Sequence, residues 1–79
     1  SHIRVECYAG YKADERPLRF WLAGRCYKVA EILDQWYGPG DTWFRVRAPD
    51  GNTYILRHRE SGQEDFWTLE SFRRGQGVT

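Results

Sequence analysis

The segment 42–59, TWFRVRAPDGNTYILRHR, is the most informative part of this chain for predicting its fold. Its centre, Ala48-Pro49-Asp50-Gly51-Asn52, has proline, aspartate and glycine in the order that suits a type I turn followed by a left-handed glycine. That order is typical of the three-residue hairpin loop with a glycine bulge. We therefore expect an antiparallel hairpin in which Ala48 lies opposite Asn52.

The register of this hairpin follows from the turn. Counting outward pairs Val46 with Tyr54 and Phe44 with Leu56, so that four apolar side chains share one face. A shift of one residue would set Phe44 opposite Arg57 and mix the core with charge. The other face then carries a row from each strand, namely Trp43, Arg45 and Arg47 opposite Arg57, Ile55 and Thr53.

The rest of the chain has the same alternation of short strands and turns. Turn residues stand at Ala23-Gly24, Gly38-Pro39-Gly40 and Ser61-Gly62-Gln63, and the runs between them are rich in aromatic and β-branched residues. We expect a loop over 8–17 and strands over 3–9, 18–22, 25–29, 42–48, 53–59 and 65–72.

One segment allows two interpretations. Val29, Ile32, Leu33 and Trp36 have the spacing of a helical stripe, which Gly38-Pro39-Gly40 would end. No capping residue precedes the stripe, and a bulge near Ala30-Glu31 restores the alternation of a strand. We favour a strongly bent strand that continues 25–29 towards Trp36.

These elements predict an all-β domain, a small SH3-like, partly open antiparallel barrel of five to six short strands. Its domain would span 3–75, with 1–2 a tag remnant and 76–79 a frayed tail. Besides the four core residues of the hairpin, alternation predicts buried side chains at Leu18, Phe20, Leu22, Tyr27, Val29, Trp67 and Leu69.

Composition limits the classes of function. The chain has 79 residues and a formal net charge of +1, and a domain of this size has a thin core with little room for a deep cleft. No apolar run is long enough for a membrane helix, and the first residues of the sequence lack the basic, apolar and small-residue pattern of a secretory signal. We expect a cytoplasmic domain that is not an enzyme, needs no cofactor and does not contact a membrane.

The residues capable of chemistry are few. Cys7 and Cys26 are expected to be buried thiols, with a single disulfide bridge as the alternative. Together with His58 they lack the spacing and number of a structural zinc site. Cys26 and His58 as a nucleophile and its base would need a third group and a pocket. We predict no catalytic residue and no metal ligand.

A longer pattern resembles a known family. Gly24-Arg25-x-Tyr27-x-Val29, then Leu33-Asp34-x-Trp36, and later Trp67-x-Leu69 are similar to a bacterial family of small β-domains of unknown function. The resemblance covers most of 17–70 and rests on core and turn residues, so it bears on fold more than on activity. Such domains occur beside genes for error-prone or repair DNA polymerases, which implies a DNA-linked setting.

The candidate binding surface is a sheet face rich in arginine and tryptophan. All basic residues except Lys12 and Lys28 are arginines, whose planar fork stacks on rings and grips anions. The candidate ligand-binding residues are Trp21, Trp43, Arg45, Arg47, Arg57 and Arg59. Acidic residues in 60–70 offer a purely structural alternative, since they would neutralise these arginines across adjacent strands.

Three functions fit such a face. The first is a protein–protein interaction module that takes up a peptide or strand edge from an unknown partner. The second is single-stranded nucleic-acid binding, in which tryptophans stack on bases and arginines hold phosphates. The third is closure of a homodimer through the same face, so the chain is expected to be a monomer or a homodimer.

Overall fold

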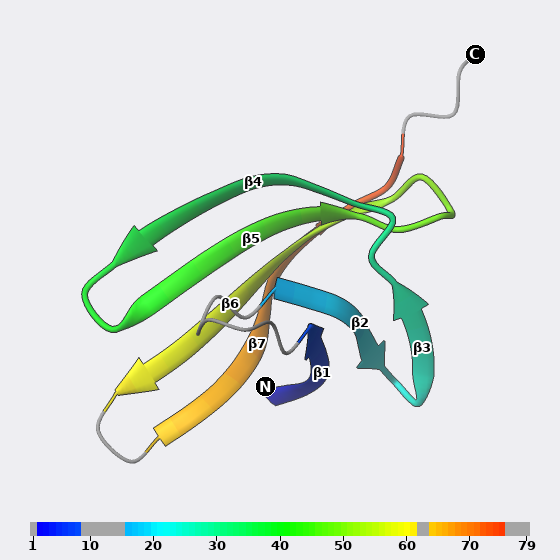
Figure 1. The fold of residues 1–79 in the computed structure, drawn as a ribbon. Coiled ribbons are helices and arrows are strands. Elements are labelled where there is room, and N and C mark those ends of the chain that lie inside the picture. The colour runs from blue at the N-terminus through cyan, green and yellow to red at the C-terminus, as the bar shows by residue number, and fades with distance from the viewer. Residues whose placement is uncertain (1, 9–15, 62–63, 76–79) are drawn as a thin grey trace.

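The computed structural model describes residues 2–8, 16–61 and 64–75. This part of the chain contains strands and turns but no helix, and all strand pairs are antiparallel. The sheet order is β3-β2-β1-β7-β6-β5-β4, and the sheet curls into a half-barrel (Figure 1). The strands are β1 (His2–Tyr8), β2 (Arg16–Leu22), β3 (Arg25–Lys28), β4 (Glu31–Gly38), β5 (Asp41–Arg47), β6 (Thr53–Ser61) and β7 (Glu64–Arg73).

The central hairpin forms as the sequence predicts. Val46 pairs with Tyr54 and Phe44 with Leu56. In the turn, the Gly51 N–H donates to the Ala48 carbonyl over 2.9 Å, and Gly51 has a φ of 89°. Glycine is favoured there because a side chain strains this left-handed backbone. The predicted register is confirmed.

The segment between the predicted turns at Ala23-Gly24 and Gly38-Pro39-Gly40 is extended. At Val29-Ala30 it changes the strand with which it pairs. The Val29 N–H donates to the Leu18 carbonyl of β2, and the next N–H, of Ala30, donates to the Arg47 carbonyl of β5, both over 2.8 Å. Consecutive N–H groups of a strand point in opposite directions, so one bent segment joins both ends of the sheet. The helical alternative is wrong. The bend also divides the predicted single strand into β3 and β4, so the described residues form seven strands rather than five to six.

The curl brings distant strands together around an aromatic core. The Phe20 ring of β2 meets the Tyr54 ring of β6 edge to face at 5.0 Å, and Tyr27 of β3 lies 5.6 Å from Tyr54. In Figure 1, β2 and β3 accordingly lie across the inner face of the longer strands. The buried residues of this hydrophobic core are Phe20, Phe44, Val46, Ala48, Tyr54, Leu56 and Trp67, with Leu22, Tyr27, Val29 and Leu69 among those packed against them.

Two predicted core positions differ from the structure. Leu18 is 42% exposed, because a bulge interrupts the alternation of β2: Glu6 pairs with Arg19 and Cys7 with Pro17, which leaves Leu18 without a partner position in β1. Pro17 and Phe20, on either side of the bulge, are buried instead. Cys26 is exposed on the short strand β3, whereas Cys7 is half-buried and packs against the core. The register sets Cys7 beside Pro17 and Cys26 beside Trp21.

The predicted chain ends and first loop are only partly described. Tyr8, Arg16 and Pro17 belong to strands, so the predicted loop is shorter at both ends, and 9–15 lie outside the described residues. The same holds for residue 1 and for the predicted frayed tail at 76–79. His2, expected to be a tag remnant, begins β1 and stacks on Phe66 at 4.1 Å.

Candidate binding surface

The outer face of β4, β5 and β6 carries most of the predicted binding residues. Trp43, Arg45 and Arg47 alternate along β5 with the buried Phe44 and Val46, so they lie on the face away from the core. Their cross-strand partners on β6 continue the same face. We call it the arginine–tryptophan face, defined by Trp36, Trp43, Arg45, Arg47, Arg57 and Arg59.

Two stacked tryptophans form the aromatic part of this face. Trp36 of β4 pairs with Trp43 of β5, and their rings are parallel within 4° with centroids 6.3 Å apart. Trp36 is 37% exposed, and the next residue, Tyr37, is 71% exposed but lies on the opposite face of β4 by strand alternation. Gln35 Nε2 donates to the Tyr37 hydroxyl over 2.7 Å. The stack therefore offers a flat apolar surface at the edge of the sheet.

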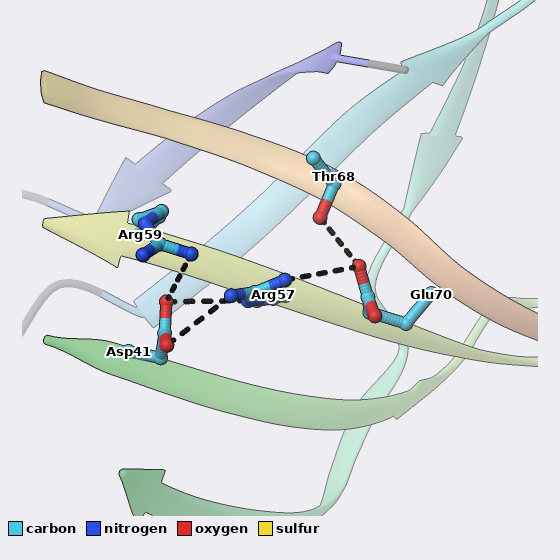
Figure 2. Close-up of polar contacts among 5 residues, drawn as sticks. All are labelled: Asp41, Arg57, Arg59, Thr68 and Glu70. Atoms are coloured by element: carbon cyan, nitrogen blue, oxygen red, sulfur yellow. Dashed lines mark hydrogen bonds and ion pairs between the residues drawn. The ribbon is translucent and has the colours of Figure 1, made fainter. Parts of the chain in front are cut away.

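The side chain of Asp41, which is only 10% exposed, holds the neighbouring Arg57 and Arg59 in place. Arg57 donates two hydrogen bonds to Asp41, from Nε over 3.2 Å and from Nη2 over 3.3 Å. Arg59 Nη1 lies 3.9 Å from the same carboxylate (Figure 2). The hydrogen bonds that Arg57 donates to Asp41 raise the pKa of the Arg57 guanidinium, so Arg57 remains charged.

On its other side Arg57 meets a second carboxylate and a ring. Arg57 Nη1 lies 4.0 Å from Glu70 Oε2, which also accepts a 2.7 Å bond from the Thr68 hydroxyl. Figure 2 shows Arg57 held between Asp41 and Glu70. The Arg57 guanidinium also lies 5.6 Å from the centroid of Trp43, within cation–π range.

The two other arginines of the face, both on β5, are paired with acids of the edge strand β4. Arg45 Nη2 lies 3.4 Å from Asp34 Oδ2, and Arg47 is hydrogen-bonded to Glu31. The purely structural alternative considered from the sequence was neutralisation by acids of 60–70. In that segment only Glu70 makes a described contact with this face, and the principal counter-charges come from β4 and Asp41.

Trp21 lies apart from the other candidates. It is on β2, which β1, β7 and β6 separate from β5 in the sheet order. The Arg4 guanidinium covers its ring at 4.3 Å. The neighbouring Arg19 lies 2.8 Å from Glu6, measured from Nε to Oε1. The structure thus brings together five of the six predicted residues.

Trp36 is the site residue that sequence reasoning missed, because it was assigned to an apolar stripe. The signal was the turn Pro39-Gly40. A two-residue loop pairs Gly38 with Asp41, and counting outward from it sets Trp36 opposite Trp43.

The side chains that could take part in catalysis or metal binding are His58 and the cysteines, and the contacts of His58 are those of a core residue. His58 is 6% exposed, stacks on Trp67 at 4.5 Å and lies 2.6 Å from Asp65, between Nε2 and Oδ1. Cys26 is on β3, several strands away in the sheet. Within 2–8, 16–61 and 64–75, no three histidine, cysteine or acidic side chains are grouped as a metal site would require.

Searches of protein-family models, curated proteins and solved structures found no match to this chain. The described residues include no helix with the length and hydropathy of a membrane span.

Proposed function

We propose that this domain is a non-enzymatic module that binds a protein through the arginine–tryptophan face. The observation that carries the proposal is the pairing of every arginine in this face with a carboxylate, beside a tryptophan stack in which Trp36 is exposed and Trp43 is half-buried. A surface of aromatic rings and internally balanced charges is typical of protein interfaces, where tryptophan, tyrosine and arginine supply most binding energy.

The position of the stack at a sheet edge supports a peptide or strand as the partner. β4 is the last strand of the sheet order, and among the described residues no strand pairs with its second edge. Its last four residues, 35–38, include no charged residue and no proline, and the bulge of β4 lies before them, so this part of the edge lacks the features that usually prevent pairing. An extended segment added beside β4 would meet Trp36 and Tyr37 while its backbone completes the ladder.

Single-stranded nucleic acid is the rival ligand, which the family resemblance also favours. The stacked tryptophans could stack on bases, but the acidic residues that alternate with the arginines disfavour nucleic acid. Glu31 and Asp41 occupy guanidinium groups that a phosphate backbone would need, and together with Asp34 they place negative charge that repels a polyanion.

Two further assignments belong to the same proposal. The bent segment at Val29-Ala30, which pairs with β2 on one side and β5 on the other, supports a relation to the SH3-like barrels. We also propose that the free domain is a monomer, so that Trp36 and Tyr37 remain open to a partner. Sedimentation at twice the monomer mass would favour the homodimer instead.

The test starts from peptides selected by display on the domain, whose affinity is then measured by fluorescence anisotropy. Trp36→Ala should weaken binding about tenfold or more, because it removes half of the aromatic stack. Tyr8→Ala is the matched control, since Tyr8 is a 59% exposed aromatic on β1. Equal losses in both variants would contradict the proposed surface.

A second titration separates the rival. A short thymidine oligonucleotide is added at low salt while tryptophan fluorescence is followed, and salt is then raised. We expect no salt-reversible quenching. Quenching that Trp43→Ala abolishes, and whose salt dependence Arg45→Ala and Arg57→Ala flatten, would establish nucleic-acid binding instead.

A further inference from the structure

A hollow of about 260 Å³ adjoins the tryptophan stack on the outer face. Its walls come from four successive strands, β4 to β7. Arg45 pairs with Ile55 and Ile55 with Ser71, and one row further along Thr53 pairs with Arg73, so these side chains share the outer face. The lining residues are Leu33, Arg45, Thr53, Ile55, Ser71 and Arg73.

Two β-bulges explain why a sheet face is hollowed here. The register of β4 against β5 shifts between Ile32 and Asp34, which leaves Leu33 as the extra residue. The register of β6 against β7 shifts at Ile55, which leaves Glu70 without a partner position. A bulge bends its strand and increases the local twist, and it is often found beside a functional site. Here the two bulges flank the hollow on both sides.

The lining combines an apolar floor with hydrogen-bond donors. Leu33 and Ile55 supply the floor, while the guanidinium groups of Arg45 and Arg73 and the hydroxyls of Thr53 and Ser71 can donate. The hydroxyl of Thr53 donates only a long 3.4 Å bond, to the Arg73 carbonyl. Arg45 meets Asp34 at 3.4 Å with both side chains about half exposed, so this ion pair is weak and the guanidinium can turn to a ligand.

We propose that this hollow binds a carboxylate on a short aliphatic stem. Two arginine forks and two hydroxyls match a carboxylate, and the Leu33–Ile55 floor matches its methylene groups. A phosphodiester fits less well, because polar ester groups flank its charged oxygens, whereas Leu33 and Ile55 offer an apolar surface beside the arginines. Only the origin of the carboxylate, an acidic side chain or chain end of a protein partner, rests on the proposed function.

The test uses 4-methylpentanoate as the probe and follows the Nε–Hε signals of the arginines by NMR near neutral pH. We expect saturable shifts at Arg45 and Arg73, and none with the neutral 4-methylpentanamide. Arg73→Gln should weaken binding about fivefold or more, because it removes one charged fork. Arg74→Gln is the matched control, since it removes the same charge one residue further along.

The other outcomes are equally distinct. Ser71→Ala should also weaken 4-methylpentanoate binding, and the amide spectrum of each variant verifies that it is folded. Equal losses from Arg73→Gln and Arg74→Gln, or equal shifts with acid and amide, would overturn the carboxylate site. Tighter binding of inorganic phosphate would also overturn it and assign the hollow to phosphate. Peptide binding that depends on Trp36 would survive failure of the hollow, which separates the two proposals.

Discussion

The indole ring of Trp43 lies against Gly38, so closely that a β-carbon at Gly38 would stand 2.9 Å from Trp43 Cζ3. Gly38 is the last residue of β4, just before the turn that returns the chain to β5. The absence of a side chain there lets the Trp43 ring lie flat beside Trp36. The geometry of the aromatic stack therefore depends on a glycine outside it.

Gly38→Ala should displace the Trp43 ring and disturb the stack. We expect the free energy of unfolding to fall by about 1–3 kcal/mol, the usual cost of overpacking, with a change in the near-ultraviolet circular dichroism of the tryptophans. The double variant with Trp43→Leu provides the control. If Gly38→Ala costs as much in that background, the clash with Trp43 is not its cause.

Ala23→Asn should stabilise the domain. Ala23 and Gly24 form the two-residue turn between β2 and β3, with φ of 50° and 78°. Asparagine tolerates this left-handed backbone better than alanine, so we expect a gain of about 0.5–1 kcal/mol in urea unfolding. Ala30→Asn, at an exposed alanine without positive φ, should bring no such gain. A loss of stability in Ala23→Asn would refute the strain argument.

Asp65→Ala should destabilise the domain, because it removes the partner of the buried His58. His58 Nε2 would lose the carboxylate 2.6 Å away while its ring stays in the core. We expect a cost of about 1–2 kcal/mol, measured by urea unfolding. Glu60→Ala removes an acid directly opposite Asp65 in the ladder and should cost less than about 0.5 kcal/mol. Similar effects of both variants would point to general charge instead of the His58 contact.

Stability should fall in alkaline solution because of Tyr54. Burial, the main cause, raises the pKa of its hydroxyl above the value of about 10 of an exposed tyrosine. Above that pH the unfolded chain loses the proton first, so the free energy of unfolding decreases until the folded state ionises as well. Below it both states are neutral and this contribution is constant. Tyr54→Phe should flatten the decline in urea-unfolding measurements above pH 10, and an unchanged slope would contradict this origin.

Asp41→Asn should weaken the outer face more than Asp34→Asn does. Asp41 is 10% exposed and receives two hydrogen bonds from Arg57, whereas the Asp34–Arg45 pair is about half exposed with a single contact of 3.4 Å. An amide removes the charge that holds Arg57 and Arg59 together. The melting temperature should therefore drop by several degrees in Asp41→Asn and little in Asp34→Asn. Equal drops would mean that Asp41 does not organise the face.

The local features of the chain were predictable because they depend on neighbouring residues. Pro49-Asp50-Gly51 determines the turn, the turn determines the register, and the register sets which face of 42–59 is buried. Five of the six candidate site residues followed from this alternation, since a strand side chain that is not on the core face must be on the other.

The errors arise where a residue's environment depends on a distant strand. Leu18 is the extra residue of a bulge where β2 pairs with β1, and Cys26 lies on β3, the last strand at its end of the sheet. Trp36 matched an apolar stripe equally well, and its exposure results from the edge position of β4. Edge positions are decided by strand order, which local patterns do not contain.

The sequence by itself determined an all-β chain, its turns, the central register and the composition of the arginine–tryptophan face. Tertiary structure decided how the bend at Val29-Ala30 joins both ends of the sheet, which acid neutralises each arginine, and where two bulges open a hollow. The physical reason is the distance along the chain over which each interaction acts. Turn and alternation preferences act within a few residues, whereas strand order, counter-charges and curvature depend on contacts between segments that meet only when the sheet curls.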